Sequence, residues 1–146
     1  PIQIGSAINP DWYAQRKFLE ALQPLTEVDF AAIDAAIALK SDITRTLNPQ
    51  TGTSYTFVLA DAGKICEFAN GSAVTVTVPP NSSVAFPVGT QIEVTQTGAG
   101  KVTFAQGSGV TITSLASYKA IAGQYASATL YQRATDTWQL SGSLIA

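Results

Sequence analysis

One segment, Ala73-Val-Thr-Val-Thr-Val-Pro-Pro80, constrains the fold of this chain more than any other. Val74, Val76 and Val78 alternate with threonines, which is the period-2 pattern of a strand with one buried face. Residues branched at Cβ fill both faces, and this favours a pleated backbone. The two prolines end the strand, because neither can donate a ladder hydrogen bond. The chain is therefore expected to build its core from β-sheets.

Further strand candidates follow at intervals of about 8–12 residues, the spacing typical of a sandwich or barrel. Turn segments separate them, among which Asn70-Gly71 is the strongest hairpin signal and Gly98-Ala-Gly100 and Ala134-Thr-Asp-Thr137 are further turns. No helical pattern lies between the strands, so parallel βαβ units are excluded and an antiparallel β-sandwich or barrel-like domain is predicted. The candidates are residues 55–59, 64–68, 73–78, 84–86, 90–97, 101–106, 110–113, 118–122, 125–133 and 137–141.

The composition changes along the chain and marks a domain boundary. Residues 1–49 hold six acidic and four basic side chains, whereas residues 51–146 hold 24 Ser and Thr but only eight charges. Turn-forming residues gather at Leu47-Asn-Pro-Gln-Thr-Gly52. We therefore predict an N-terminal docking or oligomerisation region over 1–49 and a β-sandwich domain over 50–146.

The N-terminal region is expected to be an extended arm followed by two short α-helices. Asn9-Pro10-Asp11 is a helix start, with an N-cap, a proline at the first helical position and an acid near the positive end of the dipole. Pro24 ends this helix. Its apolar residues either pack on the chain's own β domain or form a docking surface for a partner. The candidate docking residues are Ile2, Ile4, Trp12, Tyr13 and Phe18.

The second helix begins at Thr26-Glu-Val-Asp29, a weaker form of the capping box, and extends to about residue 43. Phe30, Ile33 and Ile37 keep 3–4 spacing along it. This stripe either packs within its own domain or forms a short oligomer seam. Isoleucine at both core positions favours trimers or larger assemblies.

The amino-acid composition of the chain argues against several classes of function. The 146 residues include no His, which excludes the usual general base and every His-based triad. Ten acidic and eight basic residues give a net charge of −2, with no basic patch for nucleic acid or for an acidic membrane surface. No apolar run approaches the length of a membrane-spanning helix. We expect no nucleic-acid partner and no membrane partner.

The remaining reactive side chains favour structural roles. Asp61 and Asp136 lie in predicted turns, where Asp serves backbone geometry. Glu67 and Glu93 lie on separate predicted strands and are expected to be solvated, although a glycosidase pair would use such residues. Cys66 is the single cysteine and reads as a small buried residue rather than a reactive thiol. We predict no enzyme, no cofactor, no metal and no catalytic residue.

A series of motifs runs from about residue 48 to residue 146, over the segments Thr53–Lys64, Val74–Asn81, Phe86–Ile92, Gly98–Gly100, Gly107–Ile112, Gly123–Leu130 and Thr135–Trp138. With these motifs in this order, the chain resembles a β-domain that recurs in tailed-bacteriophage virion proteins, notably tail-fibre tips and head fibres or decoration proteins. The resemblance implies homotrimeric assembly and no cofactor, and it offers no catalytic residues to carry over.

Only an arm and two helices precede the β domain, which suits a capsid decoration (cement) protein or short head fibre better than a long tail fibre. Such a protein is made in the host cytoplasm and resides on the virion, where its partners are the major capsid protein or another virion protein. The alternative is a tail-fibre receptor-binding module for a host surface glycan or protein. That alternative predicts an exposed aromatic cluster of Tyr118, Tyr125 and Tyr131. A capsule depolymerase would need two converging carboxylates.

Overall fold

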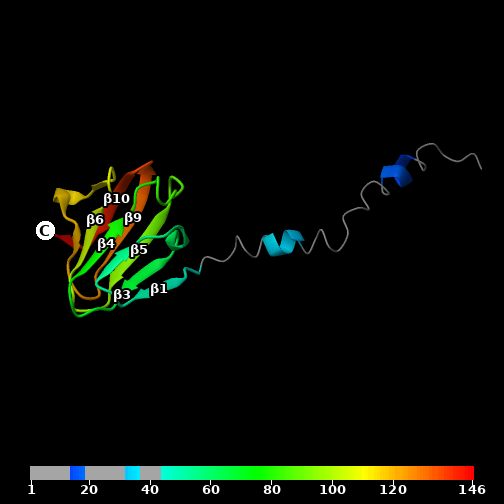
Figure 1. The fold of residues 1–146 in the computed structure, drawn as a ribbon. Coiled ribbons are helices and arrows are strands. Elements are labelled where there is room, and N and C mark those ends of the chain that lie inside the picture. The colour runs from blue at the N-terminus through cyan, green and yellow to red at the C-terminus, as the bar shows by residue number, and fades with distance from the viewer. Residues whose placement is uncertain (1–13, 19–31, 37–43) are drawn as a thin grey trace, which may run out of the picture. The chain divides into compact units, whose positions relative to one another are not determined.

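The computed structural model describes residues 14–18, 32–36 and 44–146. Short helices cover 14–18 and 32–36 (Figure 1), and each lies inside one of the two predicted helices. The remainder of those helices, and the predicted extended arm, lie outside the described residues. Neither of the two described helices is long and apolar enough to cross a membrane.

The chain divides into two compact units, Pro1–Thr44 and Arg45–Ala146. The predicted boundary after residue 49 therefore falls inside the second unit, in strand β1 (Leu47–Gln50). This segment contains a proline and reads as a turn, but it pairs with β3 (Ile65–Phe68) as the edge strand of a sheet. A proline is tolerated there because an edge strand leaves one side of its backbone unpaired.

The second unit is built from β-strands, as the sequence predicts, and they form one six-stranded and one five-stranded sheet. Sheet A contains β1, β3, β5 (Gln91–Gln96), β7 (Thr111–Thr113), β9 (Ser127–Ala134) and β10 (Thr137–Gly142). Sheet B contains β2 (Ser54–Thr56), β4 (Val74–Val78), β6 (Val102–Gln106), β8 (Ala120–Ile121) and β11 (Leu144–Ile145). Two 3₁₀ turns, η1 (Leu59–Asp61) and η2 (Leu115–Ser117), connect strands.

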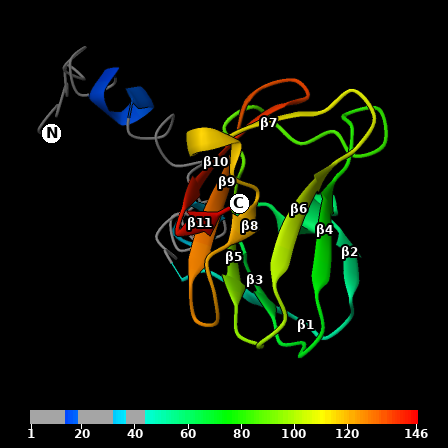
Figure 2. The same ribbon diagram turned by 90° about the vertical axis from the view of Figure 1, so that its left-hand side faces the viewer.

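The strand order is β1-β3-β5-β9-β10-β7 in sheet A and β11-β8-β6-β4-β2 in sheet B. Five of the nine strand pairs are parallel, so the prediction of an antiparallel domain is wrong for them. The first six strands alternate between the two sheets, which places β1, β3 and β5 side by side in one and β2, β4 and β6 in the other (Figure 2). Among these six strands, each pair of parallel neighbours is joined by a connection that crosses to the facing sheet, forms a strand there and returns, in place of the helix that usually joins parallel strands.

Two of the predicted hairpins are arches between the sheets. Asn70-Gly71 links β3 in sheet A to β4 in sheet B, and Gly98-Ala-Gly100 links β5 to β6. Only the third prediction is confirmed: Thr135 and Asp136 join β9 to β10 in an antiparallel hairpin, with φ of 55° at Asp136. The residues that allow a tight change of direction do not decide whether the next strand pairs with the last one or faces it.

The arches stack on one another. The Asn70 carbonyl accepts a hydrogen bond from the Gly100 N–H at 2.8 Å, and the Asn70 side chain donates to the Thr51 carbonyl at 2.6 Å. The Gly98 N–H donates to the Phe68 carbonyl at 2.9 Å. Backbone groups of three successive arches thereby satisfy one another, as the strands beside them do.

The core between the sheets follows the predicted alternation. In β4 the three valines are at most 1% exposed while Thr75 faces outward, which confirms the central strand. Trp138 is buried, as predicted, and packs edge to face against Phe86 with ring centroids 5.4 Å apart. Residues 84–86 are not a strand, so that prediction is wrong, although Phe86 supplies core volume from a loop.

Strand limits differ from the prediction where the chain changes direction. In place of the predicted strand over 55–59, β2 ends at Thr56 and the chain then enters η1 at Leu59. The predicted strand over 118–122 is limited to the two residues of β8. Strands β1 and β11 have no counterpart in the prediction. Both are short edge strands, and a segment of that length gives little periodic signal.

Candidate functional site

The predicted docking and oligomer residues fall mostly outside the described part of the chain. Phe18 lies on the helix over 14–18 and is 65% exposed, and Ile33 lies on the helix over 32–36 and is 48% exposed. The docking surface and the oligomer seam stay predictions, each represented among the described residues by one solvent-facing apolar side chain. The residues outside the described ranges are Ile2, Ile4, Trp12, Tyr13, Phe30 and Ile37.

Glu67 and Glu93 come closer together than the sequence indicates. They lie on neighbouring parallel strands, β3 and β5, and both alternate with buried residues, so they share the outer face of sheet A. Glu67 is level with Thr95, two positions beyond Glu93. Glu93 accepts a charged hydrogen bond from Arg45 at 2.5 Å, so this carboxylate already has a cationic partner on the outer face of the sheet.

The Arg45 side chain gives this ion pair a structural role. Its other guanidinium nitrogens donate to the carbonyls of Gly63 and Lys64 at 3.1 and 3.0 Å. The Glu93 carboxylate on β5 and two consecutive carbonyls just before β3 are therefore held by the first residue of the β unit. A planar guanidinium satisfies such a divergent set of acceptors, which an ammonium would not.

A buried carboxylate, Asp61, lies in a network of polar side chains in the β unit. It is 1% exposed and accepts hydrogen bonds from the Asn48 amide at 2.7 Å, the Tyr55 hydroxyl at 2.9 Å and the Val58 N–H at 2.8 Å. The bond to Val58 confirms the predicted role in turn geometry. The hydrogen bonds from Asn48 in β1 and Tyr55 in β2 were not predicted. Whether these residues lie near Asp61 depends on the tertiary structure, which no local pattern shows. Through these three hydrogen bonds, the buried carboxylate and its donors all have partners.

Burial makes Cys66 and Tyr55, the neighbours of Asp61, poor acids. Burial raises the pKa of the Cys66 thiol to about 12, and the nearby Asp61 charge acts in the same direction. Burial and the hydrogen bond to Asp61 raise the pKa of Tyr55 to about 12. Cys66 is fully buried, which confirms the prediction of a structural residue. No group of three or more His, Cys, Asp or Glu suited to a metal ion occurs in residues 14–18, 32–36 and 44–146.

The Cys66 thiol gives a direct test of this part of the core. Because it is the single cysteine of the chain, any reaction of the protein with Ellman's reagent reports on it alone. We expect no reaction of the native protein at pH 8 and full reaction in guanidinium chloride, since neither access nor a thiolate is available in the folded state. Rapid labelling of the native protein would contradict the burial of β3.

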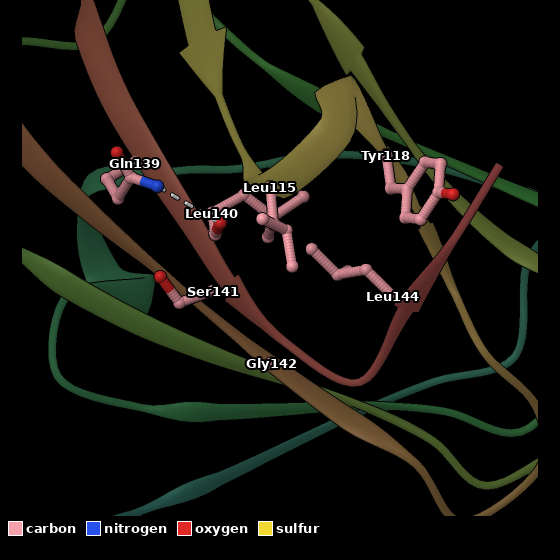
Figure 3. Close-up of a pocket in the computed structure, with 7 residues that line it drawn as sticks. All are labelled: Leu115, Tyr118, Gln139, Leu140, Ser141, Gly142 and Leu144. Carbon is pink, nitrogen blue, oxygen red and sulfur yellow. Dashed lines mark hydrogen bonds between the residues drawn. The ribbon is translucent and has the colours of Figure 1, made fainter.

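A notch of about 310 Å³ lies in the β unit beside the end of β10. We call it the β10 notch. Figure 3 shows Gln139 and Ser141 on one side of the β10 ribbon and Leu115, Tyr118 and Leu144 on the other, with Leu115 and Leu144 pointing toward one another. Backbone atoms of β10 complete the lining, which is formed by Leu115, Tyr118, Gln139, Leu140, Ser141, Gly142 and Leu144.

The notch forms where β7 stops pairing with β10. Strand β7 covers β10 only from Thr137 to Gln139, and the chain then leaves the sheet through η2. Ala116 and Ser117 both adopt left-handed backbone conformations, with φ of 52° and 62°, which non-glycine residues rarely adopt in succession. This turn holds Leu115 with 82% of its surface exposed. Backbone strain of this kind gathers at functional sites.

Two hydrogen bonds fix the turn and the polar rim. The Ser114 hydroxyl donates to the Tyr118 carbonyl, which closes η2. The Thr113 hydroxyl donates to the Gln139 side-chain oxygen at 2.8 Å, which orients that amide (its nitrogen lies 3.4 Å from the Leu140 carbonyl). The turn and the Gln139 amide are therefore held in place by contacts within the protein.

The three tyrosines of the predicted aromatic cluster are all at least 36% exposed. Among the described residues, no ring contact joins any two of them. Tyr118 lines the notch, Tyr125 lies in the turn before β9 with φ of 67°, and Tyr131 on β9 is level with Gln139. The notch also contains a residue that the sequence did not single out, Leu115, in the segment Ser114-Leu-Ala-Ser117.

Comparison with known proteins adds no relative: no family model, no curated protein and no solved structure matches this chain.

Proposed function

We propose that this protein is a non-enzymatic structural component of a tailed-bacteriophage virion. In this proposal it is a capsid decoration protein or short head fibre that docks through its N-terminal region and presents the β unit. The sequence resemblance over residues 48–146 supports the virion assignment. The polar side chains of the β unit also support it, because Asp61, Arg45 and Gln96 are all engaged in holding strands and arches.

The exposure of Phe18 is the observation that carries the docking part of the proposal. An aromatic side chain 65% exposed on a helix of the first unit offers apolar area that a partner would remove from water. Aromatic residues are enriched among the anchors of protein interfaces. The β unit shows the complementary property: its largest apolar side chains, Trp138, Phe57, Phe68 and Phe104, are all buried.

Capsid co-sedimentation tests this role. Capsids that lack the protein are mixed with the full chain, with a chain lacking residues 1–25, and with a Phe18→Ser variant. We expect loss of binding for the deletion and about tenfold or greater weakening for Phe18→Ser, the effect of removing an aromatic anchor. Val88→Ser is the matched control, because Val88 is a similarly exposed apolar residue in the β unit. Unchanged binding after the deletion contradicts the proposal.

Homotrimeric assembly belongs to the same proposal. Ile33 keeps 3–4 spacing with Phe30 and Ile37 and is 48% exposed, as a seam residue would be in one isolated copy. Three copies would also let weak docking contacts add up by avidity. Sedimentation equilibrium of the pure protein is expected to give a trimer that Ile33→Asp dissociates. A wild-type monomer at micromolar concentration contradicts trimeric assembly.

A receptor-binding module is the second candidate function, and the β10 notch favours it. The notch is lined by the exposed Leu115 and by Tyr118, and Gln139 and Ser141 lie on the other side of β10 (Figure 3). Two fluorescently labelled proteins are compared, the full chain and a chain that lacks residues 1–25. Both should then adsorb to host cells to the same extent. Adsorption that disappears with the deletion would contradict this function.

A further inference from the structure

We infer that Asn70 is a conditional deamidation site, which the folded β unit protects and which becomes reactive when the stacked arches open. Deamidation begins when the backbone nitrogen of the next residue attacks the side-chain carbonyl carbon of an asparagine. Glycine in the next position favours this step, because it has no Cβ to hinder the approach. Asn70 is followed by glycine and Asn81 by serine, whereas Asn9 and Asn48 precede prolines, which have no N–H to react. Asn70 is therefore the intrinsically most reactive asparagine of the chain.

The reaction consumes water and needs no other reagent. The Gly71 nitrogen loses its proton and bonds to the Asn70 Cγ, the bond between Cγ and Nδ2 breaks, and the amide nitrogen leaves with that proton as ammonia. Water then adds to either carbonyl of the five-membered imide and opens the ring. One product has aspartate at position 70. The other has isoaspartate, in which the backbone runs through the former side chain and is longer by one methylene group.

Two hydrogen bonds hold the Asn70 side chain away from this reaction. Its Nδ2, the leaving nitrogen, donates to the Thr51 carbonyl at 2.6 Å, and its Oδ1 accepts from the Ser72 N–H at 2.7 Å. The second bond closes an Asx turn, in which the side-chain oxygen faces the N–H two residues further on. Attack requires Cγ to face the nitrogen of Gly71 instead, at reacting distance. The side chain therefore has to leave both partners before the ring can close.

The next arch holds the Asn70 backbone as well. The Gly100 N–H donates to the Asn70 carbonyl at 2.8 Å. Gly98 packs so closely that an added Cβ would lie 2.2 Å from the Asn70 carbonyl oxygen and 2.4 Å from its nitrogen. Rotation about the Asn70 backbone is therefore blocked while the arches are stacked. Gly71 itself is exposed, and a Cβ there would meet nothing within 4 Å, so water reaches the dipeptide and the stack provides the protection. The rate of deamidation then depends on local opening of the arches.

The products cannot restore the stack. An ionised aspartate only accepts hydrogen bonds, so it cannot replace the donation from Asn70 to the Thr51 carbonyl. Isoaspartate lengthens the backbone at the point where Gly98 and Gly100 pack against it. Thr51 directly follows β1, so this edge strand loses a connection in either case. A transient opening of the arches is thereby converted into a permanent one.

The test compares the full-length folded protein with a synthetic peptide of residues 67–75, incubated in the same buffer at pH 8. Trypsin releases the fragment over 65–101, and tandem mass spectrometry of this fragment distinguishes Asn70 from Asn81. Enzymatic methylation of isoaspartate measures the second product. We expect Asn70 to react at least about tenfold more slowly in the folded protein than in the peptide.

Two glycine variants separate arch opening from general destabilisation. Gly100→Ala separates the arches and should accelerate the reaction of the folded protein by at least about tenfold. Gly107→Ala is the matched control, because its added Cβ also meets backbone, 2.7 Å from the Val78 carbonyl oxygen, but at the opposite end of β6. It should accelerate the reaction by less than about threefold. Circular dichroism verifies that both variants fold.

Hydrogen exchange of the wild-type protein gives the same test without a variant. Protection of the Gly100 amide, which donates to Asn70, measures the fraction of molecules with open arches. That fraction multiplied by the rate of the peptide should reproduce the rate of the folded protein within about threefold.

Several results would overturn the inference. Equal rates in the folded protein and the peptide would show that the fold does not protect Asn70. Equal acceleration by Gly100→Ala and Gly107→Ala would assign the reaction to global unfolding rather than to the arches. A rate far from the value given by hydrogen exchange would separate deamidation from arch opening. Faster modification of Asn81 than of Asn70 in guanidinium chloride would remove the chemical basis of the site.

Discussion

Replacing Gly100 by alanine is expected to destabilise the β unit by about 3 kcal/mol or more, at the upper end of overpacking effects. The added Cβ would lie 1.8 Å from the Ser72 carbonyl oxygen and 2.8 Å from the Asn70 carbonyl oxygen. Both neighbours are backbone atoms of the arch below, so no rotation of a side chain relieves the contact. The arches must separate, and the hydrogen bond from the Gly100 N–H to Asn70 is lost with them.

Thermal unfolding followed by circular dichroism measures this effect. For a unit of about 100 residues each kcal/mol lowers the melting temperature by roughly 4–8 °C, so a fall of more than about 10 °C is expected. Gly71→Ala is the matched control, because Gly71 lies in the neighbouring arch and a Cβ there meets nothing within 4 Å. It should change the stability by no more than about 0.5 kcal/mol. Equal melting temperatures for the two variants would show that the arches are not stacked as described.

The second large effect is expected for Asp61→Ala. This substitution should lower the free energy of unfolding by about 3 kcal/mol or more. The substitution removes the acceptor for Asn48, Tyr55 and the Val58 N–H, and these donors lie at the buried end of the core. A buried donor without a partner carries its full desolvation cost. Strand β1 should therefore loosen first, since Asn48 connects this edge strand to the carboxylate.

Urea titrations of graded variants separate this network from a general effect of removing an acid. Tyr55→Phe removes one hydroxyl, which donates to Asp61 and accepts from Asn48, and should cost about 1 kcal/mol, because Asn48 still donates to Asp61. Glu67→Ala removes an acid from the outer face of sheet A and should change the stability by about 0.5 kcal/mol or less. Hydrogen exchange adds a local readout, in which the amides of β3 that face β1 lose protection in Asp61→Ala. A loss for Asp61→Ala no larger than that for Glu67→Ala would contradict the network.

The candidate site was only partly visible in the sequence. The exposure of Tyr118, Tyr125 and Tyr131 was predicted and all three are exposed, with Tyr131 level with Gln139. Leu115 was not, because nothing in Ser-Leu-Ala-Ser signals a turn with two left-handed residues. The notch itself exists because β7 ends early and β11 lies nearby, and both facts concern segments more than twenty residues apart in the chain. No local pattern encodes such a meeting.

Local chemistry determined the longer strands of this protein and which face each of them buries. The alternation in Val74–Val78 placed three valines in the core, and the pair Trp138 and Leu140 followed the same rule. Glycine and asparagine likewise marked the changes of direction at Asn70-Gly71 and Gly98–Gly100, whereas Asn48-Pro49 lies in strand β1.

Only the tertiary structure decided which strands are neighbours. Asn70-Gly71 and Thr135-Asp136 are both good turns, yet one crosses between sheets and the other closes a hairpin. The difference arises from contacts across the chain: Gly98 and Gly100 allow the arches to stack closely, and Asp61 holds the first two strands together. The alternation of side chains along a strand determines which face is buried. It does not determine which strands pair with its two edges. The order and direction of the sheets therefore depend on long-range packing that a local pattern does not contain.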